Sequence, residues 1–185
     1  SELASRYPTH LTLVPLDVSS NSSVQDAAQA CSRDANQVDL LINNAGVNLR
    51  STKQSIREGL DYDDIHQMHN INAVGPLRVV ESFLPLLEKS EMKRLCFVSS
   101  EAGSIGDATR QAQFGYCMSK SALNMAVKIL FNDLRKEGFT FRLYHPGWMR
   151  SYISGQKGTR ARMEPEEAAV PAMKSFLQNP SDTAT

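Results

Sequence analysis

The sequence predicts an α/β protein in which a parallel β-sheet is covered by helices on both faces, a doubly wound three-layer arrangement. Short apolar or β-branched runs alternate along the chain with longer segments of helical periodicity. Alternation of this kind is typical of βαβ units, whose crossovers place helices on both sides of a parallel sheet. The chain has 185 residues, enough for one domain with a hydrophobic core, so we expect a single domain over residues 1–185.

Four runs are expected to form buried strands. Each is short, mostly apolar or β-branched, and bounded by polar or turn residues, which is the pattern of a strand inside a parallel sheet. The predicted strands are 11–16, 38–42, 94–98 and 139–144.

Four longer segments have the periodicity of amphipathic helices. They are 23–34, 62–88, 114–137 and 164–177. Helix 114–137 has the clearest pattern, because Gly138 follows it at a position where helices commonly end, and Pro165 suits the first turn of the last helix. The apolar stripe of helix 114–137 consists of Leu123, Ala126, Ile129, Leu130 and Leu134.

Composition argues against several classes of partner. Lys plus Arg and Asp plus Glu number 20 each, and no block of like charge occurs, so neither nucleic acid nor an anionic membrane is expected as a partner. Apolar runs are shorter than the roughly 18 residues of a membrane span, and the start of the chain has no signal-peptide pattern. The three cysteines are scattered without C-x-x-C spacing, which indicates reduced thiols and a cytoplasmic protein.

Tyr116 and Lys120 are four residues apart near the start of a predicted helix, so their side chains are expected on one helical face. A phenol with a pKa near 10 is a weak acid-base catalyst at neutral pH. A cation within about 4 to 6 Å favours the phenolate and lowers that pKa. The pair is therefore predicted to be a proton-transfer device.

Five motifs occur in an order that is more specific than any one of them. Together they resemble the short-chain dehydrogenase/reductase family, and the resemblance covers residues 17 to about 179. It implies a Rossmann-like fold and an NAD(P)-dependent oxidoreductase that acts on a small carbonyl or secondary alcohol. The motifs are Asn43-Asn44-Ala45-Gly46, Asn72, Ser99-Ser100, Tyr116-x-x-x-Lys120 and Pro146-Gly147.

The resemblance implies the catalytic roles. Tyr116 would be the general acid or base, while hydride passes between nicotinamide and substrate. Lys120 would hold the nicotinamide ribose and depress the Tyr116 pKa, and Ser100 would bind the substrate oxygen. Asn72 would complete a water-linked proton path through Lys120, although a polar residue that satisfies helix backbone at a kink explains it as well.

The sequence leaves open which serine would bind the substrate oxygen. Ser99 and Ser104 compete with Ser100, and the family usually places its serine three residues nearer the tyrosine, where this chain has Gly103. We expect three extra residues in the loop 104–113. Ser100 is preferred because it is the second residue of a serine pair directly after a strand.

The resemblance also implies the cofactor contacts. Asp17 and Val18 would lie by the adenine, although Ser19, Ser20 or Ser22 could make this stretch a helix N-cap region instead. The turn 44–46 would lie under the adenosine ribose, or serve only to hold the central strands together. Tyr116 and Lys120 would bind the nicotinamide ribose, and the segment after the fourth strand its carboxamide. The cofactor-binding residues are thus Asp17, Val18, Asn44, Ala45, Gly46, Tyr116, Lys120, Pro146, Gly147, Met149 and Ser151.

The segment 152–163 is expected to be a mobile loop that covers the substrate. Trp148 would line the pocket or be a core or interface aromatic, and the basic residues of the loop could equally be a solvated face. His66 and His69 share a helix face, but no third ligand is apparent, so no metal site is expected.

The family begins with a strand and a glycine-rich turn for the pyrophosphate, and it ends with a further strand; this chain has neither. We therefore expect an incomplete sheet in which strand 11–16 lacks its neighbours, and a chain that belongs to a longer protein. NAD and NADP cannot be distinguished without the first unit.

The alternative function is a non-catalytic fragment or degenerate member that acts as an oligomerising or regulatory module. By the same resemblance, the protein is expected to be a homodimer or homotetramer whose subunits contact one another through helices 62–88 and 114–137.

Overall fold

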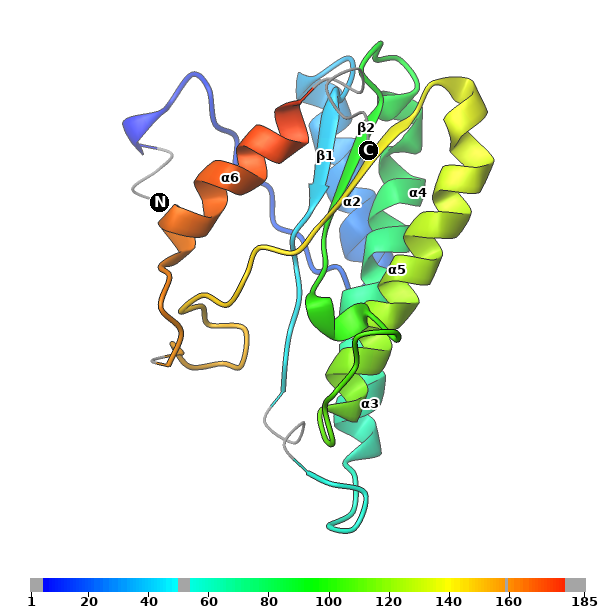
Figure 1. Cartoon of the computed structure of the whole chain (residues 1–185). Coiled ribbons are helices and arrows are strands. Elements are labelled where there is room, and N and C mark those ends of the chain that lie inside the picture. The colour runs from blue at the N-terminus through cyan, green and yellow to red at the C-terminus, as the bar shows by residue number, and fades with distance from the viewer. Residues whose placement is uncertain (1–4, 50–53, 159, 179–185) are drawn as a thin grey trace.

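A three-stranded parallel sheet forms the centre of the structure, a computed structural model that describes residues 5–49, 54–158 and 160–178 (Figure 1). The strands are β1 (Leu40–Asn43), β2 (Arg94–Val98) and β3 (Thr140–Tyr144), in the order β1-β2-β3. In the register, Leu41 lies opposite Leu95, and Leu95 lies opposite Phe141. Three of the four predicted strands are therefore confirmed, each to within about two residues.

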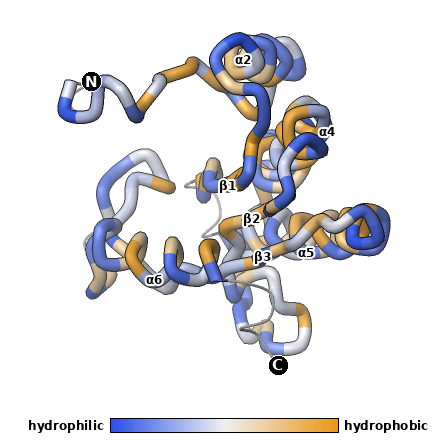
Figure 2. Tube along the Cα trace, turned by 90° about the horizontal axis from the view of Figure 1, so that it is seen from above, coloured by the Kyte–Doolittle hydropathy of each residue, from blue (hydrophilic) through white to orange (hydrophobic). Residues whose placement is uncertain are grey.

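Helices cover both faces of this sheet. On one side lie α2 (Asn21–Asp34), α4 (Gly75–Leu87) and α5 (Phe114–Leu134), and on the other lies α6 (Pro165–Leu177) (Figures 1 and 2). A single 3-10 turn, Arg135–Glu137, extends α5 to Gly138, whose φ of 88° is the left-handed conformation that commonly ends a helix. The predicted layers and the bounds of helices α2, α5 and α6, to within about two residues apart from the final turn of the α5 segment, are confirmed by this arrangement.

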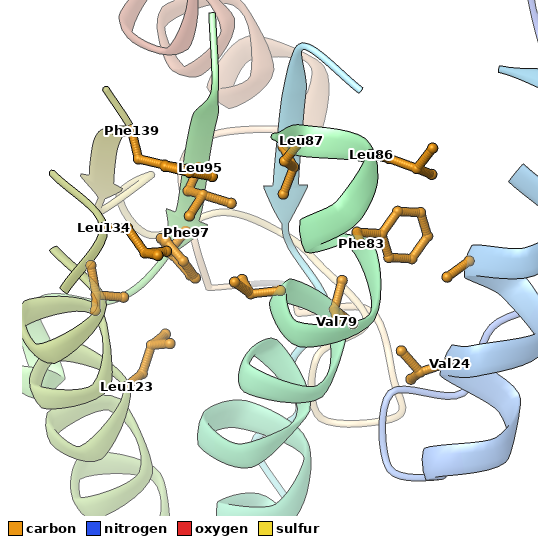
Figure 3. Packing of buried hydrophobic residues seen from close by; sticks show 13 residues of the cluster. Val24, Val79, Phe83, Leu86, Leu87, Leu95, Phe97, Leu123, Leu134 and Phe139 are labelled. Atoms are coloured by element: carbon orange, nitrogen blue, oxygen red, sulfur yellow. The ribbon is translucent and has the colours of Figure 1, made fainter. Parts of the chain in front are cut away.

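The hydrophobic core lies between the sheet and the helices α2, α4 and α5. Strand β2 directs Leu95 and Phe97 into it, because alternate residues of a strand face the same side. Figure 3 shows these two side chains between Leu87 and Phe83 of α4 and Leu123 and Leu134 of α5. In the predicted stripe of α5, Leu123 and Leu134 are buried, whereas Ile129 is 59% exposed, so that part of the prediction was wrong.

The opposite face of β2 holds α6 through a buried guanidinium. Arg94 is 2% exposed and donates from Nη1 to the carbonyls of Phe176 and Gln178 at 2.8 Å. Arg142 of β3 donates to the carbonyls of Ser175 and Gln178 as well. Both cations lie at the C-terminal end of a helix, where unpaired carbonyls and the helix dipole favour positive charge.

The expected strand 11–16 does not form. Leu13 is 57% and Leu16 45% exposed, and the backbone hydrogen bonds just before this segment are those of a turn, from the His10 and Leu11 N–H groups to the Tyr7 carbonyl. A strand is stable only when a neighbour takes up its N–H and C=O groups, and Pro15 contributes no donor. Within the described residues no strand lies beside this segment, so its apolar pattern leads only to an extended connection.

The single helix predicted over 62–88 is in fact interrupted. It consists of α3 (Tyr62–His69), the π-helical stretch η2 (Asn70–Val74) and α4. Pro76 has no N–H to continue the regular ladder, and a π-helical stretch absorbs the mismatch. Gly75 lets α4 begin against Val18, because a Cβ at Gly75 would lie 3.1 Å from the Val18 side chain.

The parts of the chain that the structure describes contain no helix long and apolar enough to cross a membrane. They also contain no group of three or more His, Cys, Asp or Glu side chains suited to a metal ion. The three cysteines are free, and burial raises the pKa of the Cys96 thiol to about 12, so this residue behaves as an apolar filler.

Candidate active site

The three strands of the sheet end at a common edge, because they run parallel, and the loops that follow them lie together there. The loop after β1 is joined to the loop after β3 by a hydrogen bond of 2.8 Å from the Asn48 amide to the Ile153 carbonyl. The loop after β2 is joined to the end of β3 by an ion pair of 3.6 Å between Glu101 and His145. Motifs that lie up to a hundred residues apart therefore share one end of the molecule.

Tyr116 lies in the first turn of α5 and interacts with Ser100, which follows β2. A hydrogen bond from the Ser100 side chain acts to lower the pKa of the phenol. The competing serines are occupied elsewhere: Ser99 donates to Asn124 at 2.6 Å, and Ser104 donates to Asp107 at 2.7 Å. Ser100 also donates to a neighbour, Glu101, at 2.7 Å, but it acts on the pKa of the Tyr116 phenol, so it stays the preferred candidate.

The electrostatics of Tyr116 differ from the expectation. Burial raises the pKa of the phenol above its ordinary value, and this effect outweighs the Ser100 hydrogen bond. The Lys120 ammonium lies 5.9 Å from the centre of the Tyr116 ring and is not among the causes of the shift. The prediction that Lys120 depresses the Tyr116 pKa is therefore wrong for this structure, because the ammonium is drawn toward the end of β2.

Lys120 is itself a perturbed group. Its side chain is 3% exposed, its ammonium donates to the Val98 carbonyl at 3.0 Å, and burial lowers its pKa to about 8. A Cβ at Gly46 would lie 3.6 Å from this ammonium and 3.4 Å from the side-chain amide oxygen of Asn72. The glycine thus marks a place where the first loop, the π-helical stretch and α5 converge.

Asn72 is buried in the π-helical stretch and holds the first loop to α5. Its amide oxygen accepts from the Val47 N–H at 2.8 Å, and its amide nitrogen donates to the Val47 carbonyl at 2.8 Å and to Ser119 at 2.9 Å. Ser119 in turn donates to the Tyr116 carbonyl at 2.8 Å. The alternative to a catalytic role was that Asn72 satisfies the helix backbone at a kink. Asn72 does lie at a helix irregularity, but it bonds to the backbone of Val47 in the loop after β1.

Asp17 and Val18, which were expected beside the adenine, lie in the connection that precedes α2. Asp17 accepts from the Ser19 N–H and hydroxyl, and these bonds lower the pKa of its carboxyl group. Ser20 is the N-cap of α2, so the capping role and the Asp17 turn coexist. Asn44 and Ala45 are exposed after β1.

The segment after β3 turns at Gly147, whose φ of 83° is one that L side chains rarely adopt. Pro146 and Ser151 are half-buried, and Met149 bridges to Met163 across the base of the predicted loop. Lys157 of the loop pairs with Glu164 at 3.2 Å, as does Arg150 just before the loop at 2.6 Å, so one of the loop's three basic residues closes the loop rather than only facing solvent. Trp148 is 69% exposed, which excludes a place in the core of this structure.

Three residues beside the predicted pair were not assigned to the site from the sequence. Glu101 accepts from the Ser100 hydroxyl at 2.7 Å and from Arg110, and His145 lies 3.6 Å from the same carboxylate. Glu101 stands directly after Ser100, but nothing in the spacing relates it to Arg110 in a loop or to His145 directly after β3.

A shallow concavity of about 540 Å³ lies at the start of α3. Gln54 and the residues from Glu58 to Asp63 line it. None of the predicted site residues contributes to it, so the candidate site rests on the convergence of the strand ends.

The sequence is similar to known proteins. Residues 1–161 match the family profile described as short chain dehydrogenase. The "C-signal" protein of Myxococcus xanthus is 43% identical over 122 residues, which are 66% of this chain and 72% of that protein. The "1-hydroxy-2-glutathionyl-2-methyl-3-butene dehydrogenase" of Rhodococcus sp. (strain AD45) is 34% identical over 168 residues, which are 90% of this chain and 72% of that protein.

Among solved structures, the NADPH-bound carbonyl reductase from chicken fatty liver superimposes with a TM-score of 0.83. Its sequence is 29% identical, and the match covers 98% of this chain and 75% of that one. This similarity confirms the Rossmann-like α/β fold.

Proposed function

This chain belongs to the short-chain dehydrogenase/reductase family and is an oxidoreductase, and we propose that it reduces a small carbonyl compound, or oxidises the matching secondary alcohol, with NAD or NADP. The observation that carries the proposal is that Ser100, which caps the turn after β2, lies at the same end of the sheet as Tyr116 and Lys120 of α5, with the Lys120 ammonium 5.9 Å from the centre of the Tyr116 ring. It unites a hydrogen-bond donor for a substrate oxygen with a group able to exchange a proton at the same oxygen.

The residues at the strand ends suit a nicotinamide cofactor. Gly46 leaves space beside the Lys120 ammonium and the Asn72 amide that a side chain at this position would enter. An ammonium has three donors, and the hydrogen bond to the Val98 carbonyl uses one of them. The Asn48 amide oxygen is buried without a partner among the described residues, which is a further polar group open to a ligand.

We assign the cofactor contacts by family resemblance. Asp17 and Val18 would hold the adenine, and the turn after β1 its ribose. Tyr116 and Lys120 would hold the nicotinamide ribose, and the loop after β3 the carboxamide. When bound, the nicotinamide supplies or accepts the hydride. The remaining assigned contacts are Asn44, Ala45, Gly46, Pro146, Gly147, Met149 and Ser151.

The protonation states favour Tyr116 as an acid. Burial raises its pKa, so the phenol retains its proton at neutral pH, which is the form that carbonyl reduction requires. Ser100 would fix the carbonyl oxygen, and Tyr116 would donate its proton to that oxygen. Lys120, with a pKa of about 8, remains mostly cationic at neutral pH and would hold the nicotinamide ribose. Asn72 would keep the loop after β1 and α5 in register and complete the proton path.

The direct test replaces the phenol. Tyr116→Phe is expected to reduce carbonyl turnover by at least about a hundredfold, the size of a lost general acid, and to leave NADH and NADPH binding nearly unchanged. Turnover is followed by nicotinamide absorbance with a panel of aldehydes and ketones, and binding by nicotinamide fluorescence. Tyr7→Phe is the control, because Tyr7 is exposed and more than a hundred residues before Tyr116 in the sequence. Turnover retained by Tyr116→Phe would remove Tyr116 from its role.

We also propose that the protein is a homodimer or homotetramer formed through the helices within 62–88 and 114–137. Met118, Met125 and Ile129 of α5 are 55%, 62% and 59% exposed. Their spacing of seven and four residues places them on one face of the helix. An exposed apolar row of this kind favours association with a second surface.

We further propose that residues 1–185 form a single catalytic domain. The reaction would take place in the cytoplasm, because free thiols such as those of the three cysteines persist there. The competing proposal is a non-catalytic oligomerising or regulatory module. It would be favoured if the protein bound neither NADH nor NADPH and still assembled.

A further inference from the structure

The carboxylate of Glu101 joins three segments at the carboxyl end of the sheet. It accepts a hydrogen bond from the Ser100 hydroxyl at 2.7 Å and one from Arg110 of the loop 104–113. His145, at the end of β3, lies 3.6 Å from the same oxygen that Ser100 contacts. Glu101 therefore ties Ser100, the long loop and the last strand to one charged group.

The Ser100 hydroxyl has one proton and two lone pairs. Its proton is donated to Glu101, and its oxygen accepts from the Ala102 N–H at 3.2 Å. The same side chain acts to lower the pKa of the Tyr116 phenol, so Glu101 and the phenol oxygen compete for the one serine proton. Glu101 thus determines which way the serine proton points.

We propose that Glu101 is a positioning residue: held by Arg110 and His145, its carboxylate orients the Ser100 hydroxyl and places a fixed negative charge beside the Tyr116 phenol. The inference rests on the proposed function, since it concerns the same serine and tyrosine. It assigns no contact between Glu101 and substrate.

Glu101 does not serve as a store for the reaction proton. Although burial acts to raise it, hydrogen bonds from Arg110 and Ser100 bring the pKa of Glu101 to about 2. The ordinary value of a phenol is 10.0, so a proton on Tyr116 would not transfer to this carboxylate at neutral pH. The group remains ionised and acts through its charge and its hydrogen bond.

The charges around Tyr116 are balanced by this pair. Glu101 acts to raise the pKa of the phenol and Arg110 acts to lower it, while Cys117 adds a further raising effect. The Lys120 ammonium lies 5.9 Å from the ring, and His145 faces Glu101. Removal of the carboxylate leaves the Arg110 cation unpaired next to the phenol.

The first test titrates Tyr116 directly, without catalysis. The near-ultraviolet absorbance of tyrosinate is followed against pH, and the curve of Tyr116→Phe is subtracted to isolate this phenol. Glu101→Gln is expected to shift the titration to lower pH and Arg110→Gln to higher pH, with the double variant between them. An unchanged titration in both single variants, or a shift to higher pH in Glu101→Gln, would overturn the proposal.

The control is Asp107→Asn. Like Glu101, Asp107 accepts from a nearby serine hydroxyl, that of Ser104 at 2.7 Å, but it is not among the groups that shift the Tyr116 pKa. Its substitution is expected to leave the Tyr116 titration and the turnover unchanged. A shift as large as that of Glu101→Gln would show a general effect of loop charge and contradict a specific role for Glu101.

The second test measures turnover in the purified protein. Glu101→Gln is expected to lower kcat for carbonyl reduction about three- to tenfold, the difference between a charge-assisted and a neutral hydrogen bond, with KM for the cofactor unchanged. Glu101→Asp, which keeps the charge, should recover part of the loss. Equal loss in both variants together with a raised cofactor KM would indicate a structural role and refute positioning. Retained turnover in Tyr116→Phe would refute the proposed function alone, and the titration would still decide the role of Glu101.

Discussion

Lys120 is a cation that the fold removes from water. Its side chain is 3% exposed, and its ammonium is held by the Val98 carbonyl at 3.0 Å rather than by the Tyr116 hydroxyl. Desolvation penalises the charged form, so the pKa falls from 10.5 to about 8. A cofactor ribose that accepted hydrogen bonds from this ammonium would compensate for part of that penalty.

The Lys120 shift has a consequence for stability against pH. The pKa of the folded state is the lower one, so between about pH 8 and pH 10.5 the unfolded chain binds more protons than the folded chain. Stability therefore rises with pH across this window, and below pH 8 the full cost of the buried charge remains. Relative to Lys120→Met, the wild type is expected to gain up to roughly 3 kcal/mol of unfolding free energy across the window.

Urea unfolding of both proteins, measured without cofactor from just below pH 8 toward pH 10.5, checks this expectation. Lys128→Met on the exposed side of the same helix is the matched control, since Lys128 is exposed and only stacks on Phe131. A constant difference between wild type and Lys120→Met across the window would contradict the assignment.

At the scale of secondary structure elements, the 3-10 turn η3 (Glu101–Gly103) packs directly on α5. A Cβ at Gly103 would lie 2.9 Å from the carbonyl carbon and oxygen of Lys120 and 2.7 Å from the Asn124 amide nitrogen. Because two of these atoms are backbone, the contact cannot be relieved by a rotamer change. The close approach is what brings Ser100, which caps this turn, to the side of α5 that carries Tyr116.

Gly103→Ala is therefore expected to push η3 away from α5. The cost in unfolding free energy should be about 1–3 kcal/mol, as for overpacked interiors, and turnover should fall as Ser100 moves away from Tyr116. Chemical denaturation and steady-state kinetics measure the two effects.

Gly106→Ala in the following loop is the matched control for this experiment. A Cβ at Gly106 has nothing within 4 Å, so its substitution should be neutral or slightly stabilising through the unfolded chain. If Gly103→Ala behaved like Gly106→Ala, the packing of η3 on α5 would not govern the position of the serine.

At the scale of the whole molecule, the exposed apolar row on α5 predicts self-association. Met125→Glu would place a charge in the middle of the row between Met118 and Ile129, and it is expected to reduce the mass seen by sedimentation equilibrium to that of the monomer. Val170→Glu, a 73% exposed position on α6 beyond the other face of the sheet, should leave the mass unchanged. A monomeric wild type would contradict the proposed assembly.

Much of the architecture follows from local pattern. Strands β1, β2 and β3 and helices α2, α5 and α6 lie where periodicity and end signals predict them, because these signals act between near neighbours in the chain. The segment 11–16 has the same kind of apolar pattern and yet forms no strand, since strand formation also needs a partner. The interruption of helix 62–88 depends on Pro76 and on the contact of Gly75 with Val18, which periodicity does not report.

The sequence by itself determined the order of the elements, the family and the candidate residues at the strand ends. Only the tertiary structure decided that Ser99 donates to Asn124 and Ser104 to Asp107, while Ser100 acts on the pKa of the Tyr116 phenol. It also decided that burial raises the Tyr116 pKa and that Glu101 gathers Arg110 and His145. The physical reason is that side-chain contacts between distant segments, and the water that packing removes from them, arise only when parallel strands bring their ends to one edge.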